Sequence, residues 1–427
     1  MGEQTKTLTA RDKQVIWHPY TQHKTMAAPI PVVKGEGVYL VNENGNKYID
    51  AISSWWTNIH GHAHPFIAQK IFEQAQQLEH VIFAGCTHEP AVRLAEKILG
   101  LLQGNFSRIF YSDNGSTAVE VGIKMAIQFH KNKGQHQRTK VLALTHAYHG
   151  DTFGSMSVSG RGVFTEAFND FLFDVVFVNL PELHESPEFT MPAIDPAEIA
   201  CFIYEPLVQG AGGMRMYHAS ALQKILTFCK QEGIICIADE VMTGFYRTGK
   251  LFASDYVPEK PDIICLSKGL TGGSLPLAIT ACTHTIFEAF LDNNLRSTFF
   301  HGHSFTANPL ACAAALASLE LLEQPLCQEN IAYLVEQNRE FVQHLQRTNY
   351  GQPILNVRSL GTILAFELHS DKKEYLDKVK EETMEQTLEQ GVLLRPLGNT
   401  LYIMPPYCIT AVQLEKVYAT IDKLLHR

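Results

Sequence analysis

Apolar residues in the middle of the chain gather in short continuous runs rather than alternating with polar residues. Seven of these runs cover residues 108–112, 140–144, 175–179, 199–204, 234–238, 262–266 and 277–282. Continuous runs of this length are typical of strands buried on both faces of a parallel sheet. Helix-like segments separate several of them, at residues 116–131, 219–232 and 308–322. Strands and helices in alternation predict an α/β fold, with a large domain built on a mainly parallel sheet.

The last hundred residues follow a different pattern. A charged helix is predicted over residues 372–390, two short strands around residues 397–399, and a final helix that opens with the capping box from Thr410 to Gln413. These elements predict a small α+β domain, beside which the turn-rich strands near the N-terminus pack. The expected units are an N-terminal segment (1–58), a large domain (59–330) and a small C-terminal domain (331–427).

Charge and apolar content narrow the class of protein. The 427 residues include 35 Lys+Arg and 44 Asp+Glu, a net charge of −9. This balance disfavours a nucleic-acid partner, because nucleic-acid binding relies on a positively charged surface. The first 16 residues contain no apolar stretch of the signal-peptide kind, and no apolar run approaches the roughly 20 residues of a membrane span. We therefore expect a cytoplasmic protein without a membrane partner.

The nine cysteines are spaced irregularly and form no Cys-x-x-Cys pair. Several lie inside the apolar runs, where cysteine behaves as a small buried hydrophobe. We therefore expect neither a disulfide framework nor a metal site, and a reducing compartment.

Polar residues follow five of the apolar runs directly. In open α/β sheets, ligands bind beyond the carboxyl ends of the strands, so these residues are predicted to meet at one edge. That edge would carry a glycine turn, an aromatic ring, carboxylates and a lysine. The residues concerned are 113–117, 146–151, Glu205, Asp239 with Glu240, and Lys268.

Each member of this set also has an ordinary structural explanation. Gly115, Ser116 and the residues after them either offer free N–H groups to an anion or simply cap a helix. Asp239 pairs either with a cationic ligand or with a structural partner, and Lys268 either attacks carbonyls or reaches solvent. Taken together, a phosphate cradle, an imine-forming lysine, an aspartate for a pyridinium nitrogen and a stacking ring are what pyridoxal phosphate requires.

Two stretches of the chain resemble the signature of the class III aminotransferases. They are IADEVMTGFYRTGK at 237–250 and PDIICLSKGLTGG at 261–273, with Lys268 at the Schiff-base position, 29 residues after Asp239. The resemblance implies a fold type I pyridoxal-phosphate-dependent transferase. It also implies a homodimer whose active sites lie at the subunit interface.

Other motifs resemble, over nearly the whole chain, the adenosylmethionine–8-amino-7-oxononanoate aminotransferases of biotin synthesis. They are WHPY at 17–20, SSWW at 53–56, IHG at 59–61, YHGD at 148–151, VQGAGGMRMYH at 208–218, RPLG at 395–398 and MPPY at 404–407. The resemblance implies a ping-pong aminotransferase that converts 8-amino-7-oxononanoate to 7,8-diaminononanoate, with S-adenosylmethionine as amino donor.

The same resemblance implies the cofactor residues. Lys268 would hold the cofactor as a Schiff base and move the substrate proton, and Asp239 would pair with the pyridine nitrogen. Gly115 and Ser116 would bind the phosphate.

Tyr148 would stack on the cofactor ring opposite Val241, and together with Lys268 and Asp239 it completes the predicted catalytic set. Tyr148, Tyr20 and Trp55 would shape the substrate pocket. Arg395 would hold a substrate carboxylate, for which its guanidinium fork suits the geometry. Without the resemblance, Arg395 is equally consistent with a surface residue in a hairpin, and Trp55 is more typical of a core residue than of a ligand-binding one.

One stretch departs from the family pattern. His303-Ser304 stands where relatives that use adenosylmethionine commonly have Pro-Thr. Ser304 keeps a hydroxyl for the phosphate, expected to come from the partner subunit, whereas His303 changes backbone stiffness and polarity. Since some relatives use lysine, the lysine donor stays open.

Two other functions also stay open. One is a class III aminotransferase acting on ornithine, 4-aminobutyrate or another ω-amine, which the Trp-Trp pair and the run MRMYH at 214–218 disfavour. The other is a non-catalytic cofactor-binding regulator. Such regulators carry a DNA-binding domain, but the first 60 residues contain neither a helix-turn-helix pattern nor excess basic charge.

Overall fold

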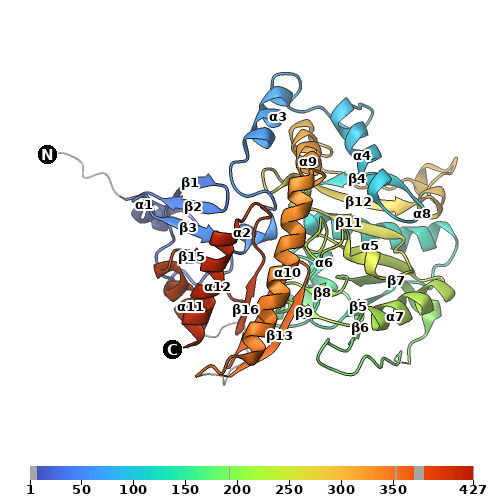
Figure 1. Cartoon of the computed structure of the whole chain (residues 1–427). Coiled ribbons are helices and arrows are strands. Elements are labelled where there is room, and N and C mark those ends of the chain that lie inside the picture. The colour runs from blue at the N-terminus through green and yellow to red at the C-terminus, as the bar shows by residue number, and fades with distance from the viewer. Residues whose placement is uncertain (1–6, 192, 352, 370–378, 427) are drawn as a thin grey trace.

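The computed structural model describes residues 7–191, 193–351, 353–369 and 379–426. Its centre is a seven-stranded sheet with the strand order β4-β12-β11-β10-β7-β5-β6 (Figure 1). Strands β10, β11, β7, β5 and β6 pair in parallel, and β12 runs antiparallel to both of its neighbours. All seven predicted runs are strands of this sheet, which confirms the mainly parallel α/β architecture. The strands are β4 (Phe106–Ser112), β5 (Lys140–Leu144), β6 (Val175–Val178), β7 (Ile199–Tyr204), β10 (Ile235–Asp239), β11 (Ile263–Leu266) and β12 (Ala278–Thr283).

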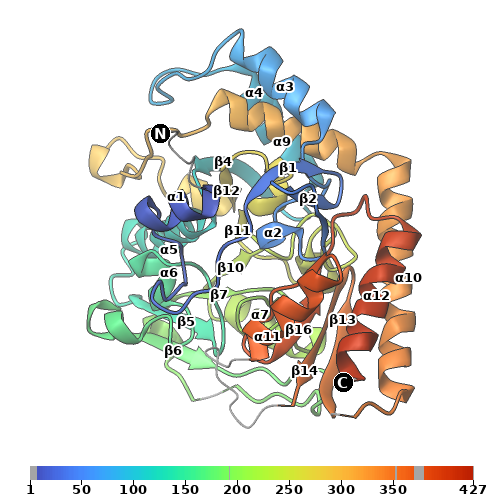
Figure 2. The same cartoon turned by 90° about the vertical axis from the view of Figure 1, so that its left-hand side faces the viewer.

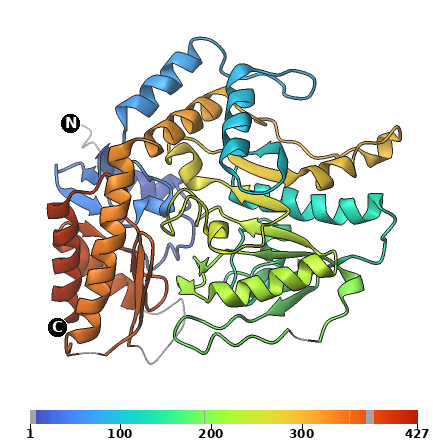
Figure 3. The same cartoon turned by 45° about the vertical axis from the view of Figure 1, so that its right-hand side comes forward.

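Both faces of the central sheet are covered because successive residues of its strands point to opposite sides. Ile237 and Ile263 pack on one side with apolar residues of α5 (Gly115–Asn132), while Cys236 and Ile264 pack on the other with those of α7 (Ala219–Gln231). Figure 3 shows the yellow-green α7 in front of the strands. Helices α5, α7 and α9 (Pro309–Leu322) agree with the three predicted helices to within a residue.

The C-terminal part forms a three-stranded antiparallel sheet, β13-β14-β16, flanked by helices. The capping box of α12 is present: Thr410 Oγ1 accepts the Gln413 N–H (3.4 Å), and Gln413 Oε1 accepts the Thr410 N–H (2.8 Å). The predicted helix over 372–390 lies partly outside the described residues, and its described part contains α11. The elements are α10 (Pro325–Arg347), β13 (Ile354–Leu360), β14 (Ile363–Leu368), α11 (Val379–Glu389), β16 (Thr400–Ile403) and α12 (Ala411–Leu425).

The two strands predicted around residues 397–399 exist but belong to different sheets. β15 (Val392–Leu393) pairs in parallel with β3 (Lys47–Asp50), whereas β16 pairs with β14. With β1 (Val32–Glu36) and β2 (Tyr39–Asn42), β3 and β15 form a four-stranded sheet, so the N-terminal strands lie against the C-terminal part (Figure 2). The segment between β15 and β16, which carries Arg395, thus crosses from one sheet to the other. The domain boundaries expected at residues 58 and 330 stay predictions.

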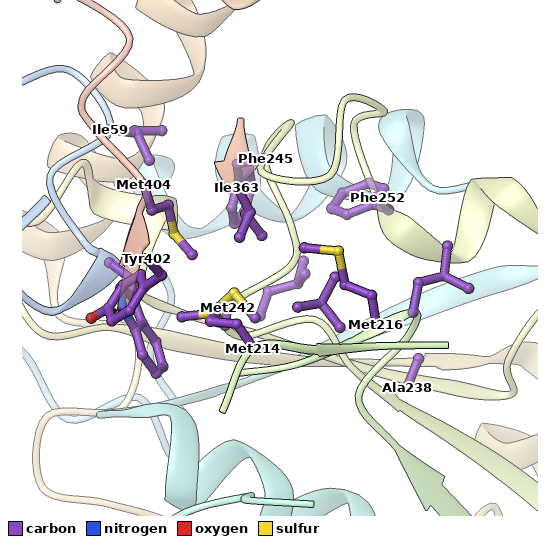
Figure 4. Packing of buried hydrophobic residues seen from close by; sticks show 14 of the residues in the cluster. Ile59, Met214, Met216, Ala238, Met242, Phe245, Phe252, Ile363, Tyr402 and Met404 are labelled. Atoms are coloured by element: carbon purple, nitrogen blue, oxygen red, sulfur yellow. Dashed lines mark hydrogen bonds between the residues drawn. The ribbon is translucent and has the colours of Figure 1, made fainter. Parts of the chain in front are cut away.

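One hydrophobic cluster joins the central sheet to the C-terminal sheet. Figure 4 shows Ala238 of β10, Ile363 of β14 and Tyr402 of β16 around a group of methionine side chains. Methionine is flexible and fills irregular gaps, which suits a junction between sheets of different orientation. The labelled methionines are Met214, Met216, Met242 and Met404.

The remaining elements surround these sheets. They are α1 (Leu8–Val15), α2 (Ser53–Trp56), α3 (Pro65–Ala75), α4 (Glu89–Leu101), α6 (Phe153–Ser157), α8 (His284–Glu288), β8 (Val208–Gln209) and β9 (Arg215–Met216). Within the described residues, no single helix is long and apolar enough to cross a membrane; α9 and α10, bent by 70° at their break, meet that test only as a pair. The same residues contain no cluster of three side chains placed to hold a metal ion.

Candidate active site

A cavity of about 410 Å³ lies beyond the carboxyl ends of the central strands. Its lining includes Gly115, Tyr148, Glu205, Asp239 and Lys268, which lie at or just beyond the ends of five different strands. The prediction that polar residues after these strands meet at one edge of the sheet is therefore confirmed for these five, but Glu240, also expected there, does not line the cavity. A larger cavity of about 920 Å³ adjoins it and also contacts Tyr148, but it is not lined by Lys268 or Asp239. The smaller cavity thus holds the chemically distinctive residues.

Lys268 begins a short 3-10 turn directly after β11, with φ at 49° in the left-handed region. Its Nζ lies 4.5 Å from the centroid of the Trp56 ring. Burial lowers the pKa of Lys268 from 10.5 to about 8, while the negative charges of Asp239 and Glu205 oppose that shift. A substantial fraction of this amine is therefore neutral, and nucleophilic, near physiological pH.

Asp239 ends β10 and is only 4% exposed. Its Oδ2 accepts a hydrogen bond from His149 Nδ1 (2.7 Å), and its Oδ1 accepts the N–H of Val241 (3.0 Å). The other ring nitrogen of His149, Nε2, is buried without a partner among the described residues. Two donors thus fix the orientation of the aspartate carboxylate at the edge of the cavity, where it can pair with a cationic ring nitrogen.

The first turn of α5 closes the opposite side of the cavity. Asn114 caps the helix by accepting the Thr117 N–H (3.0 Å), and the first N–H groups, from Gly115 and Ser116, have no acceptor within the helix. A Cβ at Gly115 would come within 2.7 Å of Val241 Cγ1, so only glycine permits this close approach. Because its first N–H groups are free and line the cavity, the helix start can receive an anion there.

Tyr148 belongs to a hydroxyl cluster at the cavity mouth. Its hydroxyl donates to Asp151 Oδ2 (2.8 Å) and lies 3.0 Å from the hydroxyl of Tyr20, which also donates to Asp151. Burial, and then the neighbouring Tyr20 and Asp151, raise the pKa of Tyr148 above its ordinary value, so the phenol stays neutral. The role of Asp151 as the shared acceptor was missed from sequence, although its i, i+3 spacing from Tyr148 was visible.

Aromatic side chains line the outer part of the site. The Arg395 guanidinium lies 4.6 Å from the centroid of the Trp55 ring, which is 5.5 Å from that of Tyr20. Trp55 is 41% exposed, whereas Trp56 is buried and donates from Nε1 to the Tyr402 hydroxyl (2.9 Å). Trp56 is thus a core residue that also touches Lys268, and Trp55 faces the open side.

The turn that presents these two tryptophans is strained. Ser53, Ser54 and Trp56 have φ values of 52°, 58° and 67°, which side-chain-bearing residues rarely adopt. Ser53 Oγ donates to the carbonyl of Met404 (2.8 Å), and Ser54 Oγ to Oδ2 of the buried Asp50 (2.9 Å). Strained conformations of this kind persist only where surrounding contacts hold them, and they are concentrated at functional sites.

Ser304 is the one predicted site residue that this chain does not bring to the cavity or its aromatic rim. It is exposed in the turn before α9 and lines neither of them. The neighbouring His303 points back to the site, with Nδ1 3.6 Å from Oδ2 of Asp113, beside the start of α5.

Comparisons with known proteins agree with this geometry. The family model "Aminotransferase class-III" matches residues 20–425. The chain is 47% identical to the adenosylmethionine-8-amino-7-oxononanoate aminotransferase of Synechococcus elongatus, covering 96% of this chain and 98% of the relative. It is 38% identical to the protein of the same name from Geobacter sulfurreducens, with 99% and 98% covered.

Solved structures match equally well. The crystal structure of the adenosylmethionine-8-amino-7-oxononanoate aminotransferase of Methanocaldococcus jannaschii superposes with a TM-score of 0.88 at 36% identity, covering 96% of this chain and 98% of that one. An amine transaminase from an uncultivated Pseudomonas species, solved in a form described as PLP-bound, has a TM-score of 0.87 at 30% identity, with the same coverage.

Proposed function

Because the chain belongs to the class III aminotransferases, we propose that it transfers an amino group to 8-amino-7-oxononanoate, giving 7,8-diaminononanoate for biotin synthesis. The matched solved transaminases confirm the predicted fold type I architecture. The observation that carries the proposal is the meeting of Lys268, Asp239 and the start of α5 in one cavity, with Arg395 and aromatic rings at its mouth. Whole-length similarity to relatives with this named activity supports the substrate.

The residues of the cavity fit pyridoxal phosphate. The helix start at Gly115 and Ser116 suits a phosphate, the carboxylate of Asp239 suits a protonated ring nitrogen, and Lys268 suits the aldehyde carbon. When bound, this cofactor accepts the electrons of a bond that breaks at the substrate carbon bearing nitrogen. Tyr148 and Val241 both line the cavity, which supports the proposal that they contact the two faces of the cofactor ring.

The chain's own residues supply the proton movements and the positioning. With the cofactor bound, Lys268 would take the proton from the substrate carbon that bears nitrogen and deliver it to the carbon on the other side of that nitrogen. Asp239 keeps the ring nitrogen protonated, with His149 fixing the orientation of the carboxylate. Tyr148 and Asp151 order the mouth of the site through their hydrogen bond.

The aromatic rim supports the proposed substrates. Arg395, held over the Trp55 ring, presents two parallel N–H groups that suit a substrate carboxylate. The rings of Tyr20 and Trp55 can cover the alkyl chain of the oxononanoate. They can also receive the sulfonium of S-adenosylmethionine by cation–π attraction, worth about 0.5–2 kcal/mol. We therefore keep S-adenosylmethionine as the donor.

We also propose a homodimer located in the cytoplasm. The exposed position of Ser304 supports the expectation that its hydroxyl serves the phosphate of the partner subunit. The same exposed turn would then connect the two active sites of the dimer.

Separate half-reactions test the proposal. Purified enzyme loaded with pyridoxal phosphate is mixed with S-adenosylmethionine, lysine or ornithine, and the cofactor absorbance reports uptake of the amino group. Only S-adenosylmethionine should react fast, and adding 8-amino-7-oxononanoate should then restore the starting spectrum. Fast reaction with lysine alone would overturn the donor. Failure of the oxononanoate to restore the spectrum, where another ketone does, would overturn the acceptor.

A further inference from the structure

A second buried carboxylate, that of Glu205, lies in the same cavity and has no part in the roles proposed above. Glu205 directly follows β7 and is 5% exposed. Its Oε1 accepts the N–H of Tyr148 (2.9 Å), and its Oε2 accepts the N–H of Gly210 (2.8 Å). One carboxylate therefore ties together two loops that are separate in sequence.

The first loop borders the cavity directly, and the second borders it through Trp56. The first carries Tyr148, which lines the cavity. The second passes so close to Trp56 that a Cβ at Gly210 would lie 3.2 Å from its ring. Since Lys268 Nζ rests over that ring, Glu205 connects the Tyr148 loop with the loop that supports the ring beside the lysine.

Charge at this position also matters. Burial and the nearby Asp239 raise the pKa of Glu205 to about 7, while His149 and the two N–H donors oppose the rise. Protonation would turn one oxygen from an acceptor into a donor that faces an N–H, so one of the two loop contacts would be lost. The titratable groups around Glu205 are Asp239, His149, Lys268 and Tyr217.

We propose that Glu205 is a positioning residue for amino transfer, whose ionised carboxylate holds the Tyr148 and Gly210 loops in place around the bound cofactor. The inference rests on the proposed function for the cofactor, but it does not depend on which ketone accepts the amino group. It predicts that the cofactor environment, and not only stability, changes when this carboxylate is altered.

Two variants of the loaded enzyme separate the charge from the geometry. Glu205→Gln keeps the size but places an NH₂ group against one N–H. We expect a weaker circular dichroism band of the bound cofactor and a kcat lower by about 10- to 100-fold, the range typical of lost positioning. In the wild type, kcat should fall as the pH drops through about 7. This acidic limb of the pH profile should be absent from Glu205→Gln. Glu205→Asp keeps the charge but is too short for both N–H groups, so the limb should stay while the band weakens.

Glu240 offers a matched control. It is fully buried and likewise accepts two backbone N–H groups, from Ala253 (3.0 Å) and Ser254 (2.6 Å), but it does not line the cavity. Glu240→Gln should lower the melting temperature as Glu205→Gln does, yet leave the cofactor band and the acidic limb as in wild type.

The inference is overturned if Glu205→Gln keeps the wild-type band and limb, or if Glu240→Gln alters them equally. Because the dichroism requires only bound cofactor, these results decide the role of Glu205 even if the acceptor is a different ketone. Failure of the proposed function would instead appear in wild type, as missing cofactor or missing half-reactions.

Discussion

At the residue scale, the site depends on placing one partly neutral amine and one hydrogen-bonded carboxylate within the same small cavity. Asp239 accepts hydrogen bonds from His149 and from the N–H of Val241, which fix its carboxylate. Lys268 lies against the Trp56 ring, and desolvation at this buried position lowers the pKa of its amine.

The first prediction concerns the pH dependence of Lys268 in cofactor-free enzyme. With a pKa of about 8, about one Lys268 in ten is neutral at pH 7, against about one in 3,000 for an ordinary lysine. Its acylation rate should rise about tenfold per pH unit and level off above pH 8. Mass spectrometry of labelled peptides measures this, with the exposed Lys224 as internal reference. A rate that rises steadily to pH 10 would contradict the assignment.

The second prediction concerns Asp239. Asp239→Asn should still bind the cofactor, because the amide oxygen can accept from His149. It should lose about 100-fold or more in turnover, since an amide cannot keep the ring nitrogen protonated. Bound cofactor per subunit and kcat are measured on the same preparation. Near-normal kcat with full occupancy would make Asp239 purely structural.

Sequence reasoning located these two residues because strands that end at one edge of a sheet bring their next residues together. It could not predict the hydrogen bonds that the other residues at this edge form. Glu205 bonds to the backbone of Tyr148, 57 positions away, and such a contact leaves no local pattern. Asp151 stood inside a recognised motif, but its acceptor role depends on Tyr20, which arrives from the N-terminal segment.

At the element scale, the short turn from Ser53 to Trp56 adopts positive φ values without glycine, because side-chain hydrogen bonds stabilise it. Neither Ser53 nor Ser54 suggests a left-handed backbone, and that conformation costs about 1–3 kcal/mol per residue. The bonds to Met404 and Asp50 offset this cost.

The third prediction ranks two changes at Ser54. Ser54→Ala should destabilise the protein by about 1–3 kcal/mol, because it removes a bond to a buried carboxylate and keeps the strain. Ser54→Gly loses the same bond but adopts positive φ without strain, so it should be the more stable of the two. Denaturant unfolding of both variants measures the order, and equal or reversed stabilities would contradict the strain at this turn.

The strands of the central sheet were predicted more accurately than the pairing of the C-terminal strands. Strands of the central sheet were located to within a few residues because both faces are buried, which leaves continuous apolar runs. β15 and β16 were located, but their separation into two sheets was not. Strand pairing joins segments that are distant in sequence. The four residues of β16 contain no pattern that indicates β14 as its neighbour.

At the scale of the whole molecule, the site draws on distant parts of one chain and, by our proposal, on a second chain. Tyr20 comes from the N-terminal segment and Arg395 from the crossing between two sheets, while Ser304 faces outward. An experiment on mixed dimers tests which subunit's site Ser304 serves.

The fourth prediction is such an experiment. A heterodimer of a Ser304→Ala chain with a Lys268→Ala chain should keep one working site, because the intact serine of the second chain serves the intact lysine of the first. Its activity should reach about half that of wild type and exceed both parent homodimers. If Ser304 instead serves its own chain, both sites are damaged and the heterodimer is no better than its parents.

The paired tryptophans at the cavity also make the molecule its own optical reporter. The chain contains three tryptophans, and Trp17 is 89% exposed, whereas Trp55 and Trp56 adjoin the cavity. Indole emission from the site pair overlaps the absorption of a bound pyridoxal ring, so occupancy should quench intrinsic fluorescence. Solvent-exposed Trp17 emits at longer wavelength, and replacing it with phenylalanine would leave a signal that comes from the site alone. Cofactor loading, and the arrival of each substrate, could then be followed in real time without an attached dye.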